Sequence, residues 1–67
     1  MIVAEEMRET VYKHLYQMYS RFAMDCYPYL TKELTGMIAM SAYNELIQMV
    51  QNGYLKSYYE RLMKGAV

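Results

Sequence analysis

The side chains that could do nucleophilic or acid–base chemistry are few and far apart. The chain has one histidine, His14, one cysteine, Cys26, and one aspartate, Asp25. A nucleophilic site needs a nucleophile, a base within hydrogen-bond reach and a group that orients the base. No serine or aspartate stands at a spacing that would place it beside His14. Three acidic residues fan over the solvated side of a predicted helix rather than forming a catalytic carboxylate pair: Glu5, Glu6 and Glu9. The sequence therefore predicts a protein that is not an enzyme.

Metal-ligating residues are equally scarce. One cysteine and one histidine cannot supply the four nitrogen and sulfur ligands of a structural zinc site. His14 falls at the border of an apolar helix face, where we expect it to bond to backbone or water. The alternative is a soft-metal site with Met18 one turn on and with Met7 and Cys26 nearby. Cys26 lies at the end of the same face and is expected to be a small buried hydrophobe, with an intermolecular disulfide as the alternative. We expect no metal and no cofactor.

Tyrosine and methionine dominate the large side chains, with nine and eight copies against one phenylalanine and no tryptophan. Tyrosine buries a large area while its hydroxyl stays wet, which suits the rim of a protein interface. Three tyrosines line one edge of the first predicted helix, and two methionines lie on polar faces near the following turn. These five are the predicted partner-binding residues: Tyr12, Tyr16, Tyr19, Met24 and Met37. The alternative is that the tyrosines only seal the core.

The elements that must position these side chains are helices, because apolar residues recur with a period of 3.6. The pattern predicts a long, a second long and a short helix, over residues 3–25, 32–52 and 54–64. Pro28 separates the first two, and Thr31 is the expected N-cap of the second. Gly53 is the expected left-handed cap between the last two. The predicted fold class is all-α, a single small three-helix domain over residues 1–67.

The apolar faces of the two long helices are wider than a three-helix monomer needs. Each spans about 180° or more, whereas an apolar stripe of little more than 100° faces an ordinary core. A chain of this length buries only about 60% of its unfolded surface, and a lone cysteine excludes an internal disulfide. We therefore expect an oligomeric helical bundle, in the simplest case a two-fold dimer. The residues predicted to self-associate are Leu15, Phe22, Ala39, Ala42, Tyr43, Leu46 and Ile47.

Charge and hydropathy narrow the class of partner. The formal net charge is zero, so nothing favours strong non-specific attraction to nucleic acid or anionic lipid. The most apolar segment, residues 37–50, is too short and too polar to span a bilayer. The first residues of the chain do not resemble a secretory signal, and an unpaired cysteine suits a reducing compartment. We expect a cytoplasmic protein with no membrane partner.

The expected function is that of a small helical protein-interaction module. It would be a homo-oligomer that binds and modulates another protein, in the style of an inhibitor encoded by a phage or mobile element. The alternative is a helix-turn-helix regulator that reads DNA with its last helix. That helix carries three basic residues on its outer face: Lys56, Arg61 and Lys64. Glu60 lies among them and the chain has no basic excess, so nucleic acid is the less favoured partner.

Overall fold

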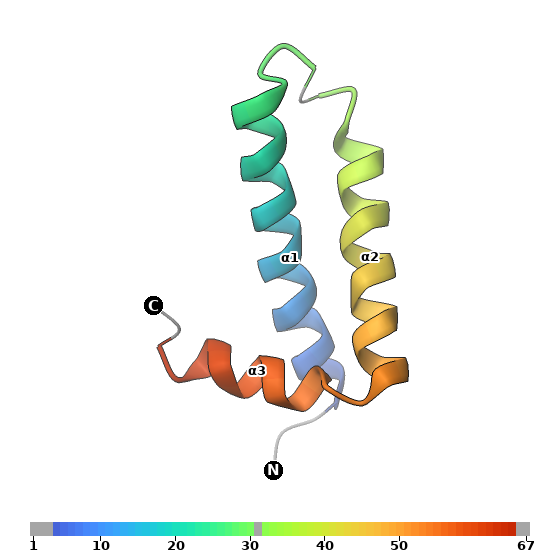
Figure 1. The fold of residues 1–67 in the computed structure, drawn as a ribbon, viewed down its shortest axis with the longest axis vertical. Helices are drawn as coiled ribbons and strands as arrows, with labels where there is room; N and C mark the ends of the chain where they lie inside the picture. Colours follow the sequence, from blue (N-terminus) through green and yellow to red (C-terminus); the bar gives the residue numbers. More distant parts are fainter. Residues whose placement is uncertain (1–3, 31, 66–67) are drawn as a thin grey trace.

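The computed structural model describes residues 4–30 and 32–65. Three helices follow one another: α1 (Ala4–Cys26), α2 (Thr35–Asn52) and α3 (Leu55–Met63). The described residues contain no strand. In Figure 1, α1 and α2 form an antiparallel hairpin, and α3 crosses the end of the hairpin at which α1 begins. The predicted all-α fold with a long, a long and a short helix is confirmed.

The first turn of the chain, between α1 and α2, begins where proline requires it. The last helical bond of α1 runs from the Tyr27 N–H to the Ala23 carbonyl, 2.7 Å away. Tyr27 itself precedes Pro28, whose ring disfavours the helical conformation in the residue before it. α2 starts at Thr35, later than predicted, because residues 32–34 form a hydrogen-bonded turn. The predicted N-cap, Thr31, lies outside the described residues.

The second turn is built on a left-handed glycine. Gly53 has φ 75°, which a residue without a Cβ adopts at no steric cost. Its N–H bonds to the Val50 carbonyl at 3.3 Å, and the Tyr54 N–H bonds to the Met49 carbonyl at 3.1 Å. This pair of bonds is the Schellman pattern, which satisfies the last carbonyls of a helix. The prediction of a left-handed cap at Gly53 is confirmed.

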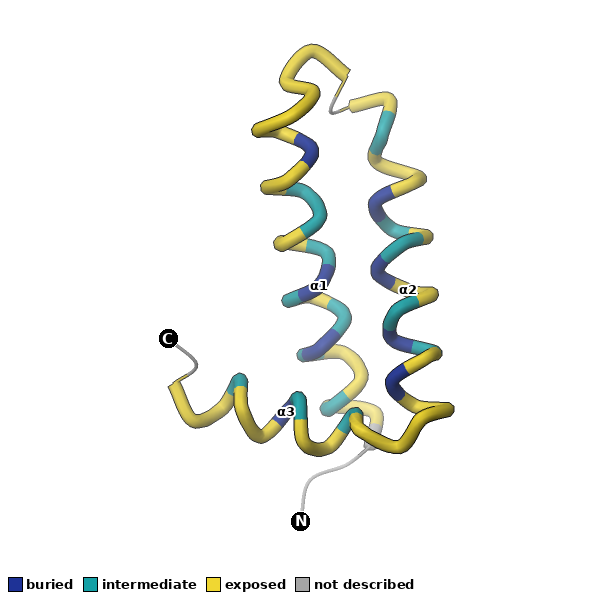
Figure 2. The backbone as a smooth tube through the Cα atoms, in the orientation of Figure 1, coloured by how far each residue is buried: buried dark blue, intermediate teal, exposed yellow. Residues whose placement is uncertain are grey.

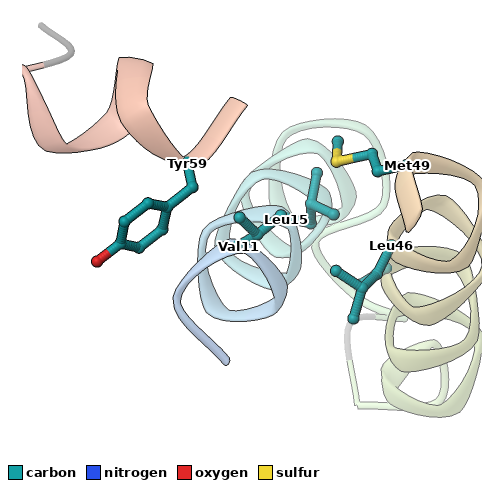
Figure 3. Packing of buried hydrophobic residues seen from close by; sticks show 6 residues of the cluster. Val11, Leu15, Leu46, Met49 and Tyr59 are labelled. Atoms are coloured by element: carbon teal, nitrogen blue, oxygen red, sulfur yellow. The ribbon is translucent and has the colours of Figure 1, made fainter. Parts of the chain in front are cut away.

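The core lies where the three helices meet. Its buried residues form one cluster: Val11, Leu15, Ala42, Leu46, Met49 and Tyr59. Figure 3 shows α1, which carries Val11 and Leu15, between α3 with Tyr59 and α2 with Leu46 and Met49. α3 packs more extensively on α1 than on α2. Among the described residues, no helix combines the length and hydropathy needed to cross a membrane.

Few residues are buried at the end of the hairpin where α1 turns into α2. In Figure 2 the buried residues line the facing sides of α1 and α2, and the turn that joins these helices is exposed. The last buried residue of α1 is Ala23, and Cys26 is exposed. The prediction that Cys26 is buried was therefore wrong. Its position continues the apolar face of α1, but α1 ends there and the next residues turn away, so no helix packs over it.

Candidate protein-binding groove

The residues predicted to self-associate divide into two groups. Three of them are buried by the chain's own helices: Leu15, Ala42 and Leu46. Ala39 and Ile47 are half-buried. Phe22 and Tyr43 are exposed, with 64% and 57% of their surfaces accessible. Only the last four therefore offer surface to a second molecule, and self-association itself remains a prediction.

The residues predicted to bind a partner do not form a single surface. Tyr12, Tyr16 and Tyr19 are half-buried and pack against the core cluster. The rings of Tyr12 and Tyr16 are 6.1 Å apart and tilted, and these two residues line a shallow depression on the outside of α1. Tyr19 instead lines a groove between α1 and α2 together with Met37. Met24 and Met37 are exposed.

That groove consists of two adjoining depressions, of about 510 Å³ and about 280 Å³, which share Tyr19 and Phe22. We call it the hairpin groove. The first depression is lined by Leu15, Met18, Tyr19, Phe22, Glu45 and Tyr58. The second is lined by Tyr19, Phe22, Ala23, Tyr27, Leu34, Met37, Ile38 and Ser41. All three helices contribute, because Tyr58 of α3 closes the end of the groove nearest the core.

The hairpin groove is apolar on its floor, and on one side Met18 and Phe22 also line a polar depression with His14, Gln17, Arg21 and Asp25. Leu15, Ala23 and Ile38 are buried beneath it, and the large side chains of Met18 and Met37 stand exposed beside it. Phe22 is common to both depressions, so it lies near the middle of the groove. A contiguous exposed apolar patch on a small soluble domain typically marks an interaction site.

One ionised group interrupts this apolar lining. Glu45 is the only charged residue that lines the groove, and the Tyr19 hydroxyl donates to its Oε2 over 2.6 Å. The hydrogen bond to Glu45 raises the pKa of Tyr19, and burial and the negative charge of Glu45 raise it further. The pKa of Tyr58 is raised mainly by burial and next by the charge of Glu45, against a lowering by Arg61. Glu45 therefore holds the Tyr19 hydroxyl in place and gives the groove a negative centre, whereas the Tyr58 hydroxyl donates to the Met18 Sδ over 4.0 Å.

His14 packs beside this groove rather than within it. Its ring meets the ring of Tyr58 edge to face, with centroids 5.9 Å apart, a favourable arrangement for aromatic rings. His14 and Cys26 are twelve residues apart on one helix, which separates their backbones by about 18 Å. One copy of the chain therefore cannot bring both to a single soft-metal ion. The described residues contain no cluster of three or more histidine, cysteine or acidic side chains.

Sequence reasoning missed several groove residues. Met18, Tyr27, Tyr58 and Glu45 line the groove, and none of them was among the predicted partner-binding residues. One signal was present for Glu45, because it is the only charged residue in the 18 residues of α2. Of the residues that would read DNA in the alternative function, Lys56 and Arg61 are exposed on α3 and Lys64 is exposed directly after its end.

Comparisons of the chain with protein-family models, with curated proteins and with solved structures gave no match.

Proposed function

We propose that this chain is a helical protein-interaction module that acts by binding, and that it modulates another protein by holding one of that protein's amphipathic helices in the hairpin groove. The observation that carries the proposal is Phe22, the only phenylalanine, 64% exposed in the middle of the groove. Covering the exposed part of such a ring removes roughly 100–160 Å² from water, which is worth about 2–4 kcal/mol. A partner that covers Phe22 therefore gains a large part of a typical binding free energy.

The shape and charge of the groove define the partner's chemistry. A channel between two helices accepts a third helix, whose apolar residues at positions i, i+3 or i+4, and i+7 anchor it. Glu45 favours a partner that carries a lysine or arginine next to those anchors, because a charge-assisted hydrogen bond forms there and an acidic residue would be repelled. The four exposed or half-buried residues Met18, Tyr19, Phe22 and Met37 supply the apolar contacts.

Photo-crosslinking in cells that express the chain tests this proposal directly. A benzophenone amino acid placed at Phe22 or Met37 reports on the groove, and the same amino acid at Lys13, exposed elsewhere on α1, is the matched control. We expect groove positions to give one discrete adduct with another protein and Lys13 to give none. Equal adducts from all positions, or groove adducts with the chain itself only, would contradict the proposal.

Once the crosslinked partner is identified, two variants test the mechanism of binding. Phe22→Ala should weaken binding by on the order of 2 kcal/mol, about thirtyfold in Kd, because it removes an aromatic anchor. Glu45→Gln should weaken binding to the natural partner, and it should weaken binding less when the basic residue of that partner has been removed. Binding that is indifferent to Phe22→Ala would rule out the groove as the site.

A further inference from the structure

A second unpartnered surface runs along the outer side of α2. Met40, Tyr43, Ile47 and Val50 repeat at intervals of three, four and three residues, the spacing of a coiled-coil seam. Met40, Tyr43 and Val50 are exposed and Ile47 is half-buried, so the part of the chain that the structure describes leaves most of this stripe uncovered. We call these four residues the α2 seam.

No charged residue of α2 lies beside the α2 seam. A helix at a protein surface ordinarily presents charged residues opposite its buried face. α2 has a single charged residue, Glu45, which lies about half a turn of the helix away from the seam and is bonded to Tyr19 in the groove. The neighbours of the seam are the amides of Asn44 and Gln51 on one side and the small Ala39 on the other. This composition is typical of an interface and not of a solvated helix face.

We infer that a second copy of this chain covers the α2 seam, with α2 packed on α2 about a two-fold axis. A two-fold interface brings each surface against itself, so it must be self-complementary. An uncharged seam meets its own copy without like-charge repulsion, and Ala39 lets the two helix backbones approach closely.

The exposed area of the chain is of the size that such a dimer needs. A compact monomer of 8.0 kDa is expected to expose about 4,450 Å². This chain exposes 5432 Å², roughly 1,000 Å² more, an excess to which both the seam and the hairpin groove contribute; each partner of a standard interface buries about 800 Å². The seam and the hairpin groove lie on opposite sides of α2, so the dimer keeps two open grooves. Self-association through the seam therefore does not depend on the proposed function of the groove.

Sedimentation of the full chain over a range of concentrations tests the inference. The wild type should sediment as a dimer at tens of micromolar. Tyr43→Lys, which puts two like charges at the centre of the seam, should raise the dimer Kd at least tenfold. The matched control is Phe22→Lys, which places the same charge on an equally exposed aromatic position in the groove and should leave the dimer intact.

A second measurement keeps the inference testable if Tyr43→Lys unfolds. In a Cys26→Ser background, Gln51→Cys beside the seam should be joined to its copy by a short bis-maleimide, whereas Gln17→Cys on the outside of α1 should not. A wild-type monomer, or crosslinking that is equal at both positions, would overturn the inference. Dissociation by Phe22→Lys but not by Tyr43→Lys would also overturn it and would assign the groove to the second copy. A monomer that still gives a heterologous adduct from Phe22 would leave the proposed function standing.

Discussion

Leu15 and Phe22 lie two turns apart on the same side of α1, and the structure predicts opposite consequences for truncating them. Leu15 is 2% exposed in the core cluster. Leucine-to-alanine changes in a core cost 2–5 kcal/mol, depending on how far the site relaxes. Leu15 also lies under the hairpin groove, where neighbours have room to move, so we expect a loss of about 2–3 kcal/mol for Leu15→Ala. A chain of this length has roughly 3–10 kcal/mol of stability in all.

Phe22→Ala should be the milder change although it removes more atoms. A buried phenylalanine replaced by alanine costs 3–5 kcal/mol. Only about a third of Phe22 is covered by the chain, so the loss of buried area is worth about 1–2 kcal/mol. The ranking of the two substitutions is therefore the reverse of the ranking by side-chain size.

Urea unfolding followed by circular dichroism measures both losses, and repeating it at several protein concentrations separates folding from assembly. A loss of 3 kcal/mol or more for Phe22→Ala would show that Phe22 is covered in solution and would refute the reasoning from its exposure. If that loss grew with protein concentration, the cover would be a second copy. A loss below 1 kcal/mol for Leu15→Ala would refute the assignment of the core.

Three further changes have defined expected outcomes. Because the pKa of Tyr19 is raised in the folded state, the contribution of Tyr19 to stability is complete below pH 10 and declines as the pH rises further. The melting temperature of Tyr19→Phe should therefore fall less steeply than that of the wild type between pH 9 and 11. Equal slopes would contradict this expectation. Gly53→Ala should cost about 1–2 kcal/mol in urea unfolding, because φ 75° is strained for any residue with a Cβ. Its control, Gly36→Ala at an uncrowded helical position, should stabilise the chain by about 0.5–1 kcal/mol, and equal effects would contradict the cap assignment. In gel shifts at low salt we expect no duplex to bind; a shift that disappears in the double variant Arg61→Ala, Lys64→Ala would instead restore the DNA-binding alternative.

The fold could be predicted from the sequence because the apolar periodicity and the helix-breaking residues are local signals. Pro28 and Gly53 act on their own neighbours, so the ends of α1 and α2 were predicted within a residue or two. The start of α2 was predicted too early, because the residues before Thr35 favour helical geometry whether they form a single turn or a continuous helix. The hydrogen bonds of residues 32–34 show a single turn, whereas helix propensity alone cannot distinguish a turn from a continuous helix.

The hairpin groove was less accessible, because it depends on where helices stop covering one another. A helical projection places Phe22 in the centre of the apolar face of α1, which suggested an interface or a core. It does not show that α3 packs across the first half of α1 only, which leaves Phe22 exposed. The bond from Tyr19 to Glu45 likewise depends on the register between α1 and α2, which no local pattern fixes.

The unequal exposure of the methionines has a consequence for oxidation. Met18 and Met37 stand beside the hairpin groove and Met40 lies in the α2 seam, all three exposed, whereas Met49 in the core is 2% exposed. Peroxide converts an accessible methionine to its sulfoxide, which is polar and no longer packs as a flexible apolar side chain. Mild oxidation should therefore make both proposed binding surfaces polar while Met49 stays reduced and the helices stay folded. Such a chain would lose its interactions before its structure, and a methionine sulfoxide reductase could restore them without refolding.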